Sequence, residues 1–117
     1  MTDKNTDSLN CGRVLVVDDN ARARQSMADV LRAAGHEVFA CSSGREALQL
    51  LDKEAVDVII TDLQMPGMTG LELIRALEAR KFDGQVAMVT AFASVEAAVE
   101  AMRHGAFDFI EKPFDAE

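Results

Sequence analysis

Short apolar runs alternate along this chain with longer segments in which apolar residues recur every three or four positions. The runs cover residues 13–17, 56–61, 86–89 and 107–110, with a weaker run at 37–40. The middle runs are nearly continuous in Val, Ile, Leu and Met, which is typical of strands that helices cover on both faces. The alternation of strands and helices predicts an α/β protein with a doubly wound, five-stranded parallel sheet.

Four segments between the runs have the spacing i, i+3, i+4 that places apolar residues on one face of a helix. Their apolar positions are Met27, Val30, Leu31 and Ala34; Ala47, Leu48 and Leu51; Leu73, Ile74 and Leu77; and Val95, Ala98, Val99 and Met102. Capping pairs and glycines stand at the ends of these segments: Ser43 with Glu46, Thr69 with Glu72, Gly35 and Gly105. The pairs have the spacing of capping boxes, and glycine commonly ends a helix.

Length and composition limit the organisation of the chain. Its 117 residues, 49% of them hydrophobic, are enough for one domain with one core. We expect residues 1–12 to be a flexible polar tail and residues 13–117 to be the domain. A membrane-spanning apolar stretch and a signal-like start are both absent from the sequence, so we expect a cytoplasmic protein without a membrane partner. The net charge of −8 argues against direct nucleic-acid binding, which uses clusters of Lys and Arg.

Polar residues follow the apolar runs at the points where the strands should end. Asp18 and Asp19 follow the run at 13–17, and Asp62 follows the run at 56–61. Thr90 comes after the run at 86–89, and Lys112 comes after the run at 107–110. In open α/β proteins the carboxyl ends of the parallel strands form the ligand-binding edge of the sheet. We therefore expect these five side chains to share one pocket.

The three aspartates suggest a metal site. An Asp-Asp pair after a strand is by itself more often a solvated turn or a helix cap, but Asp62 after a second strand changes that balance. Two carboxylates about 4 Å apart repel by roughly 4 kcal/mol at an effective dielectric near 20, so a cation or protonation must offset their charge. Oxygen ligands in a hydrated site favour Mg²⁺. Ca²⁺ is the alternative, although the ligand spacing of an EF-hand is absent.

Thr90 and Lys112 indicate what this metal site would handle. A hydroxyl and an ammonium beside Mg²⁺ can hold the oxygens of a phosphoryl group, whose transfer needs mainly positioning and neutralised charge. Asp62, at the middle of the cluster, is the expected nucleophile and would form an acyl phosphate. Asp18 and Asp19 would hold the metal and its waters.

Four motifs resemble the response-regulator receiver domains of two-component signalling. They are residues 14–20 (VLVVDDN), 62–70 (DLQMPGMTG), 89–91 (VTA) and 112–114 (KPF). The segment 95–114 is most similar to receivers of nitrogen-regulator-type transcriptional activators. The resemblance implies a flavodoxin-like sheet with strand order 2-1-3-4-5. It also implies a fifth helix after Phe114, which a chain ending at Glu117 cannot contain, so we expect the N-terminal fragment of a longer protein.

The resemblance also assigns roles to the site residues. It implies that Asp62 accepts a phosphoryl group from a sensor histidine kinase. Asp19, Asp62 and the backbone carbonyl of Gln64 would bind Mg²⁺ directly, and Asp18 would act mainly through metal-bound water.

A switch is the last expectation that the resemblance carries. Lys112 would pair with the phosphoryl oxygens, and Thr90 would move towards the phosphate. Phe109 would then turn inward, although an ordinary core aromatic is an equal alternative for this residue. The switch would control an output domain in transcription regulation.

Three functional hypotheses of different classes remain at this point. The first is a phosphorylation-switched signalling domain, which is not an enzyme beyond slow self-catalysed phosphorylation and dephosphorylation. A haloacid-dehalogenase-like phosphatase is disfavoured because its second acid lies two residues after the nucleophile, whereas Asp18 and Asp19 are adjacent. The third is a docking module that works without phosphorylation, which would be expected to have lost a site residue. A sheet face without its last helix would also leave apolar surface that favours a homodimer or aggregation.

Overall fold

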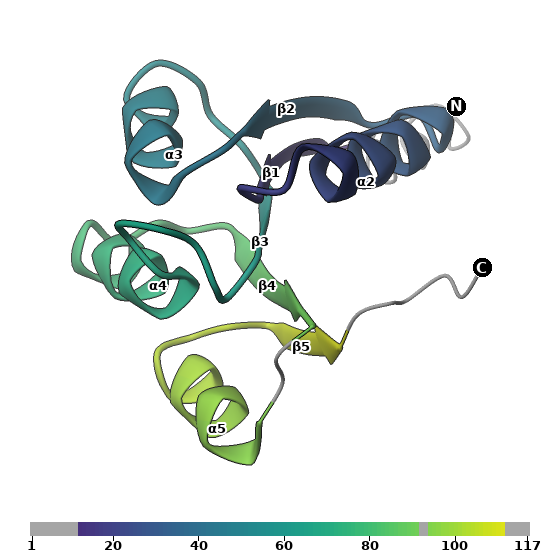
Figure 1. Cartoon of the computed structure of the whole chain (residues 1–117). Coiled ribbons are helices and arrows are strands. Elements are labelled where there is room, and N and C mark those ends of the chain that lie inside the picture. The colour runs from purple at the N-terminus through teal and green to yellow at the C-terminus, as the bar shows by residue number, and fades with distance from the viewer. Residues whose placement is uncertain (1–11, 92–93, 112–117) are drawn as a thin grey trace, which may run out of the picture.

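The computed structural model describes residues 12–91 and 94–111 (Figure 1). Their elements are, in chain order, β1 (Arg13–Val17), α2 (Ala21–Ala33), β2 (Glu37–Cys41), α3 (Gly44–Leu51), β3 (Val58–Thr61), α4 (Gly70–Ala79), β4 (Gln85–Thr90), α5 (Val95–Arg103) and β5 (Asp108–Glu111). All neighbouring strands pair in parallel, in the order β2-β1-β3-β4-β5. The doubly wound fold and its strand order are thus confirmed. In the part of the chain that the structure describes, we find no helix with the length and hydrophobicity to span a bilayer.

The sheet separates two hydrophobic clusters of unequal size. Helices α3, α4 and α5 lie on one face and α2 lies on the other (Figure 1). Leu15, Ile59 and Met88 are fully buried in the larger cluster, against α3, α4 and α5. The smaller cluster contains Val14 and other residues from β1, β2 and α2. Alternate residues of β1 enter opposite clusters because successive side chains of a strand point to opposite faces.

On the α2 face, no helix among residues 12–91 and 94–111 covers the outer strands β4 and β5. Ile110 shares this face with Val89, its partner in register, and is 38% exposed. The homodimer expected from an uncovered face stays a prediction.

The helices begin at side-chain caps, but only one of the two expected capping boxes is complete. Thr69 Oγ1 accepts a hydrogen bond from the Glu72 amide at 3.2 Å, and Glu72 Oε1 accepts one from the Thr69 amide at 2.9 Å. Ser43 caps the Glu46 amide at 3.2 Å, yet the Glu46 carboxylate accepts from Ser42 instead. The capping box predicted at Ser43 is therefore incomplete. Its second hydrogen bond, from the Ser43 amide to the Glu46 carboxylate, is replaced by bonds from the amide and the hydroxyl of Ser42.

Both predicted glycine stops are confirmed by backbone geometry. Gly35 and Gly105 follow α2 and α5 with φ angles of 99° and 98°. This left-handed conformation ends helices and is strained for residues with a Cβ.

The apolar face of α4 is confirmed, whereas that of α5 was predicted wrongly. Val95, Val99 and Met102 are 81%, 48% and 49% exposed. The helix packs on the larger cluster through Ala97 and Ala101 instead. Small side chains let a helix backbone approach the sheet closely. In α5 the alanines therefore face the sheet, and the larger apolar residues lie on the side of the helix that is exposed to solvent.

Helix α2 shows a similar, smaller departure. Met27 and Leu31 pack on the smaller cluster as expected, but Val30 and Ala34 are exposed. Ala28, which was not in the predicted stripe, is the fully buried residue of this helix.

Candidate functional site

The first part of the site is the turn from β1 to α2, which holds two aspartates in different environments. The Asp18 amide donates to the Cys41 carbonyl at 3.2 Å, which extends the β1–β2 ladder by one residue. Asp18 Oδ1 accepts from the Asn20 amide at 3.0 Å, and Arg24 Nη1 donates to the Asp18 carbonyl at 2.8 Å. Asp18 is buried, whereas Asp19 is exposed.

The second part is the loop that follows β3. The Asp62 amide donates to the Val17 carbonyl at 3.0 Å, so Asp62 lies beside the end of β1. Asp62 Oδ1 accepts from the amides of Leu63 at 2.6 Å and Gln64 at 3.4 Å. These backbone donors fix the orientation of a half-buried carboxylate at the sheet edge.

The three aspartates converge as predicted. One carboxylate oxygen from each of Asp18, Asp19 and Asp62 lies within 4.8 Å of the others. Three carboxylates at such distances repel strongly, and a hard divalent cation with oxygen ligands would offset the repulsion. The donor set fits Mg²⁺ or Ca²⁺ and lacks the nitrogen and sulfur ligands that zinc sites use. The expected ligation by the Gln64 carbonyl stays a prediction.

A solvent-open pocket of about 600 Å³ lies directly over Asp19 and Asp62. Its other walls include Gln64 and Ala91 from loops and Arg22 and Ala23 from α2. The methyl group of Ala91 leaves the approach to Asp62 open. Asp62 is therefore accessible to a small reactant.

Thr90 and Phe109 lie on the neighbouring strands. Thr90 is the last residue of β4, is fully buried, and directly precedes Ala91 in the pocket wall. Phe109 is aligned with Met88 in the ladder and packs, half-buried, against the larger cluster. Both positions are compatible with the expected switch, which stays a prediction. Lys112 lies outside the described residues.

Two arginines of the site were missed in the sequence. Arg24 anchors the Asp18 carbonyl, and Arg22 lines the pocket. One available signal was a pair of cations in the first turn of a helix, where the helix dipole favours acidic residues.

Comparison with known families decides the classification. The family model described as the response regulator receiver domain matches residues 14–117. The chain belongs to the response-regulator receiver family. Among curated relatives, the receiver is 41% identical over 104 residues to the response regulator protein FleR of Pseudomonas aeruginosa. That alignment covers 89% of this chain and 22% of FleR. The receiver is also 38% identical over 106 residues to the DNA-binding transcriptional regulator NtrC of Escherichia coli, and this alignment covers 91% of this chain and 23% of NtrC.

The predicted likeness to nitrogen-regulator-type activators is thus confirmed, and the receiver spans less than a quarter of the length of these two relatives.

Solved structures agree on the fold. The chemotaxis protein CheY4 of Vibrio cholerae has a TM-score of 0.85 at 37% identity, covering 90% of this chain and 89% of CheY4. NtrX of Brucella abortus, solved in complex with ADP, has a TM-score of 0.83 at 33% identity, covering 89% of this chain and 24% of that one.

Proposed function

We propose that this receiver accepts a phosphoryl group on Asp62 from a sensor histidine kinase, in a reaction that depends on Mg²⁺. The observation that carries the proposal is the convergence of three carboxylates within 4.8 Å, one of which, Asp62, opens on a solvent-accessible pocket. Neither a solvated turn nor a helix cap requires acids from two strands to meet in this way.

The chemistry follows from how the chain holds Asp62. An oxygen of its carboxylate attacks the phosphorus atom, so that an O–P bond forms while the bond from phosphorus to the donor nitrogen breaks in line. The Leu63 and Gln64 amides keep the carboxylate oriented for this attack, which removes much of its entropic cost. Asp18, Asp19 and Asp62 would hold Mg²⁺, whose charge offsets that of the phosphoryl oxygens.

The response to phosphorylation would begin at Thr90 and Lys112. In this proposal the Thr90 hydroxyl and the Lys112 ammonium bind the new phosphoryl oxygens, and Phe109 takes up the space that Thr90 leaves. The full burial of Thr90 next to Ala91 supports this hypothesis, because a buried residue cannot move without repacking its neighbours.

The wider role is proposed from the relatives. Since NtrC is a DNA-binding transcriptional regulator and the receiver spans 23% of it, we propose that this receiver is the input unit of a longer transcription regulator. It would act in the cytoplasm and would not itself contact nucleic acid, in keeping with its net charge of −8. A homodimer is part of the same proposal, and the receiver would be a phosphoryl acceptor with at most slow self-catalysed turnover.

Intact mass spectrometry after incubation with acetyl phosphate and Mg²⁺ tests the proposal. We expect one phosphoryl adduct that disappears in Asp62→Asn and in a metal-free control. The substitution is nearly isosteric and removes one of three repelling charges, so the metal-free variant should be folded, with an unfolding temperature no lower than that of the metal-free parent. An Asp62→Asn protein that gains the adduct at the normal rate would exclude Asp62 as the nucleophile. A folded parent that gains none would favour a docking module.

A further inference from the structure

Arg22 contributes a basic residue to the wall of the pocket that Asp62 also lines. It is the second residue of α2, which begins after the N-cap Asn20. Its side chain is exposed and lines the same pocket as Asp19 and Asp62. A reactant that enters this pocket therefore meets a wall to which an arginine contributes.

The position of Arg22 is unfavourable for the helix that carries it. The first turns of α3, α4 and α5 contain Glu46, Glu72 and Glu96, whereas the first turn of α2 contains no acidic residue. A cation near a helix N-terminus is unfavourable, because the helix dipole already places positive charge there. Local rules broken in this way are expected at functional positions.

The neighbouring Arg24 has a structural task, whereas Arg22 has none among the residues that the structure describes. Arg24 Nη1 donates to the Asp18 carbonyl at 2.8 Å and so fixes the turn before α2. Arg22 makes no hydrogen bond or ion pair with the residues in 12–91 and 94–111, so its guanidinium is available to a ligand in the pocket. Three carboxylates otherwise present negative charge to anything that approaches.

We propose that Arg22 binds the phosphoryl oxygens of an incoming anionic phosphodonor and draws it towards Asp62. This inference rests on the proposed function and adds to it a donor-binding residue. The guanidinium stays protonated throughout and forms hydrogen bonds to the donor oxygens. With acetyl phosphate, the Asp62 carboxylate forms the O–P bond, and the P–O bond to the acetyl group breaks. Acetate leaves with the bonding electron pair, so no proton has to be transferred.

The test compares phosphorylation rates of the full chain at several acetyl phosphate concentrations, with saturating Mg²⁺, by intact mass. Arg22→Gln should lower the apparent second-order rate constant by about threefold to tenfold at low ionic strength, mainly by raising the donor concentration needed for the half-maximal rate. Added salt should shrink this difference. Arg22→Lys keeps the positive charge that attracts the donor and should stay within about twofold of the parent.

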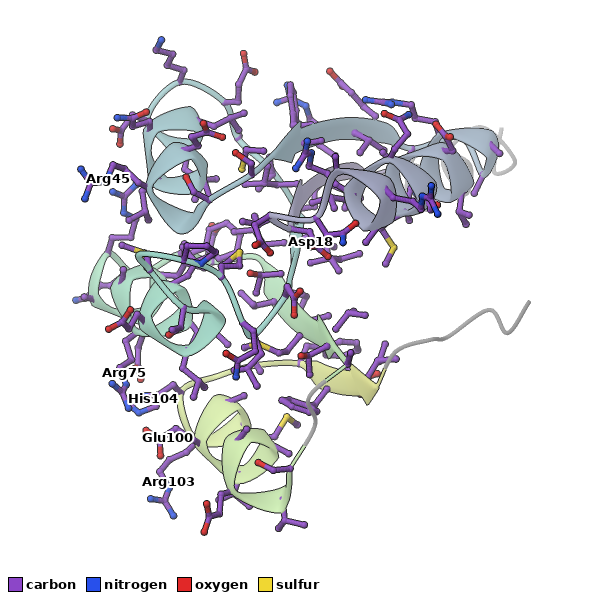
Figure 2. All side chains as sticks on the ribbon, viewed as in Figure 1. Asp18, Arg45, Arg75, Glu100, Arg103 and His104 are labelled. Atoms are coloured by element: carbon purple, nitrogen blue, oxygen red, sulfur yellow. The ribbon has the colours of Figure 1, made fainter. Side chains whose placement is uncertain are left out.

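Arg103→Gln is the matched control, since it removes an exposed arginine from the last turn of α5, away from Asp18 (Figure 2). It should leave the rate unchanged. The role of Arg22 would be overturned by equal rates for Arg22→Gln and the parent, or by a decrease in Arg103→Gln as large as that in Arg22→Gln. Either result would leave the proposed function standing. A folded parent that forms no adduct would overturn the proposed function and this inference together. Thermal unfolding of each variant shows that the compared proteins are folded.

Discussion

At the scale of single residues, the site depends on the absence of a side chain at Gly70. Its amide donates to the Leu63 carbonyl at 2.9 Å, which closes the loop after Asp62 onto the start of α4. A Cβ on Gly70 would collide with the Asp62 carbonyl oxygen, and would lie 2.9 Å from Leu63 Cα and 2.8 Å from Met88 Sδ. Two of these three atoms belong to the backbone of the nucleophile loop and cannot rotate away.

Gly70→Ala should therefore affect both stability and chemistry. We expect it to lower the free energy of unfolding by about 1–3 kcal/mol, as overpacking does, and to slow phosphorylation because Asp62 must shift. Urea denaturation and the mass-based phosphorylation rate measure the two effects. In the control Gly67→Ala, φ is 81°, but no atom of the described residues other than its chain neighbours lies within 4 Å of the new Cβ. Strain alone should then cost about 1 kcal/mol. A Gly70→Ala protein with normal stability and rate would show that the loop tolerates the displacement.

At the scale of elements, α4 and α5 are linked by a charged cluster of Arg75, Glu78, Glu100 and His104. Arg75, Glu100 and His104 of this cluster are labelled in Figure 2. His104 Nδ1 lies 2.8 Å from Glu78 Oε1, and His104 Nε2 lies 3.0 Å from Glu100 Oε2. Arg75 Nη2 lies 2.7 Å from the same Glu100 oxygen. The hydrogen bond to Glu78, followed by the one to Glu100, raises the pKa of His104 above its ordinary 6.5. The bonds from Arg75 and then His104 lower the pKa of Glu100 below 4.5.

These pKa shifts predict a pH window for the stability of the α4–α5 contact. Because the pKa of His104 is raised, its contribution is complete below pH 6.5 and is lost as pH rises through the folded pKa. Because the pKa of Glu100 is lowered, its contribution is complete above pH 4.5 and is lost as pH falls through the folded pKa. The cluster should therefore stabilise most between these two values.

Thermal unfolding of the parent and of His104→Gln between about pH 5.5 and about pH 8.5 tests the predicted loss of the His104 contribution as pH rises. The difference between their unfolding temperatures should be largest at the acidic end and should decline as pH rises. Arg103→Gln, which changes the neighbouring residue of the same helix and does not titrate in this range, should give a difference independent of pH. A constant difference for His104→Gln as well would contradict a charged His104 in the cluster.

At the scale of the whole molecule, metal binding should be coupled to folding. The three carboxylates meet only in the folded chain, because Asp18 and Asp62 are 44 residues apart and are joined through the β1–β3 pairing. A ligand that binds only the folded state stabilises it by RT ln(1 + [L]/Kd), which is about 1.4 kcal/mol at a tenfold excess of Mg²⁺ over its Kd.

We therefore expect Mg²⁺ to raise the unfolding temperature of the parent, and chelation with EDTA to reverse the effect. Asp19→Asn removes an exposed member of the cluster and should reduce the increase while also relieving repulsion in the metal-free protein. Differential scanning calorimetry at several Mg²⁺ concentrations measures both effects. An unfolding temperature that does not respond to Mg²⁺ would argue against a metal site formed on folding.

The secondary structure was predictable to different degrees in different elements. The fully buried positions of α4, Leu73 among them, carry a strong 3.6-residue period and were found, because large apolar residues mark the buried side of that helix. In α5 the buried residue is Ala101, and Val95 is exposed. A hydrophobicity pattern cannot reveal this reversal, since alanine faces the sheet there for reasons of close packing.

The sequence by itself determined the alternation of strands and helices and the positions of Asp18, Asp19 and Asp62 after their strands. The positions of these acids at the strand ends could be predicted because the hydrophobic pattern that marks a strand depends only on residues that are neighbours in the sequence. Only the tertiary structure decided that the carboxylates approach within 4.8 Å, that Gly70 touches the backbone of Asp62, and that Arg22 lines the pocket. These contacts depend on parallel register and on how a helix enters the sheet edge, which are set by long-range packing rather than by the order of residues in any one segment.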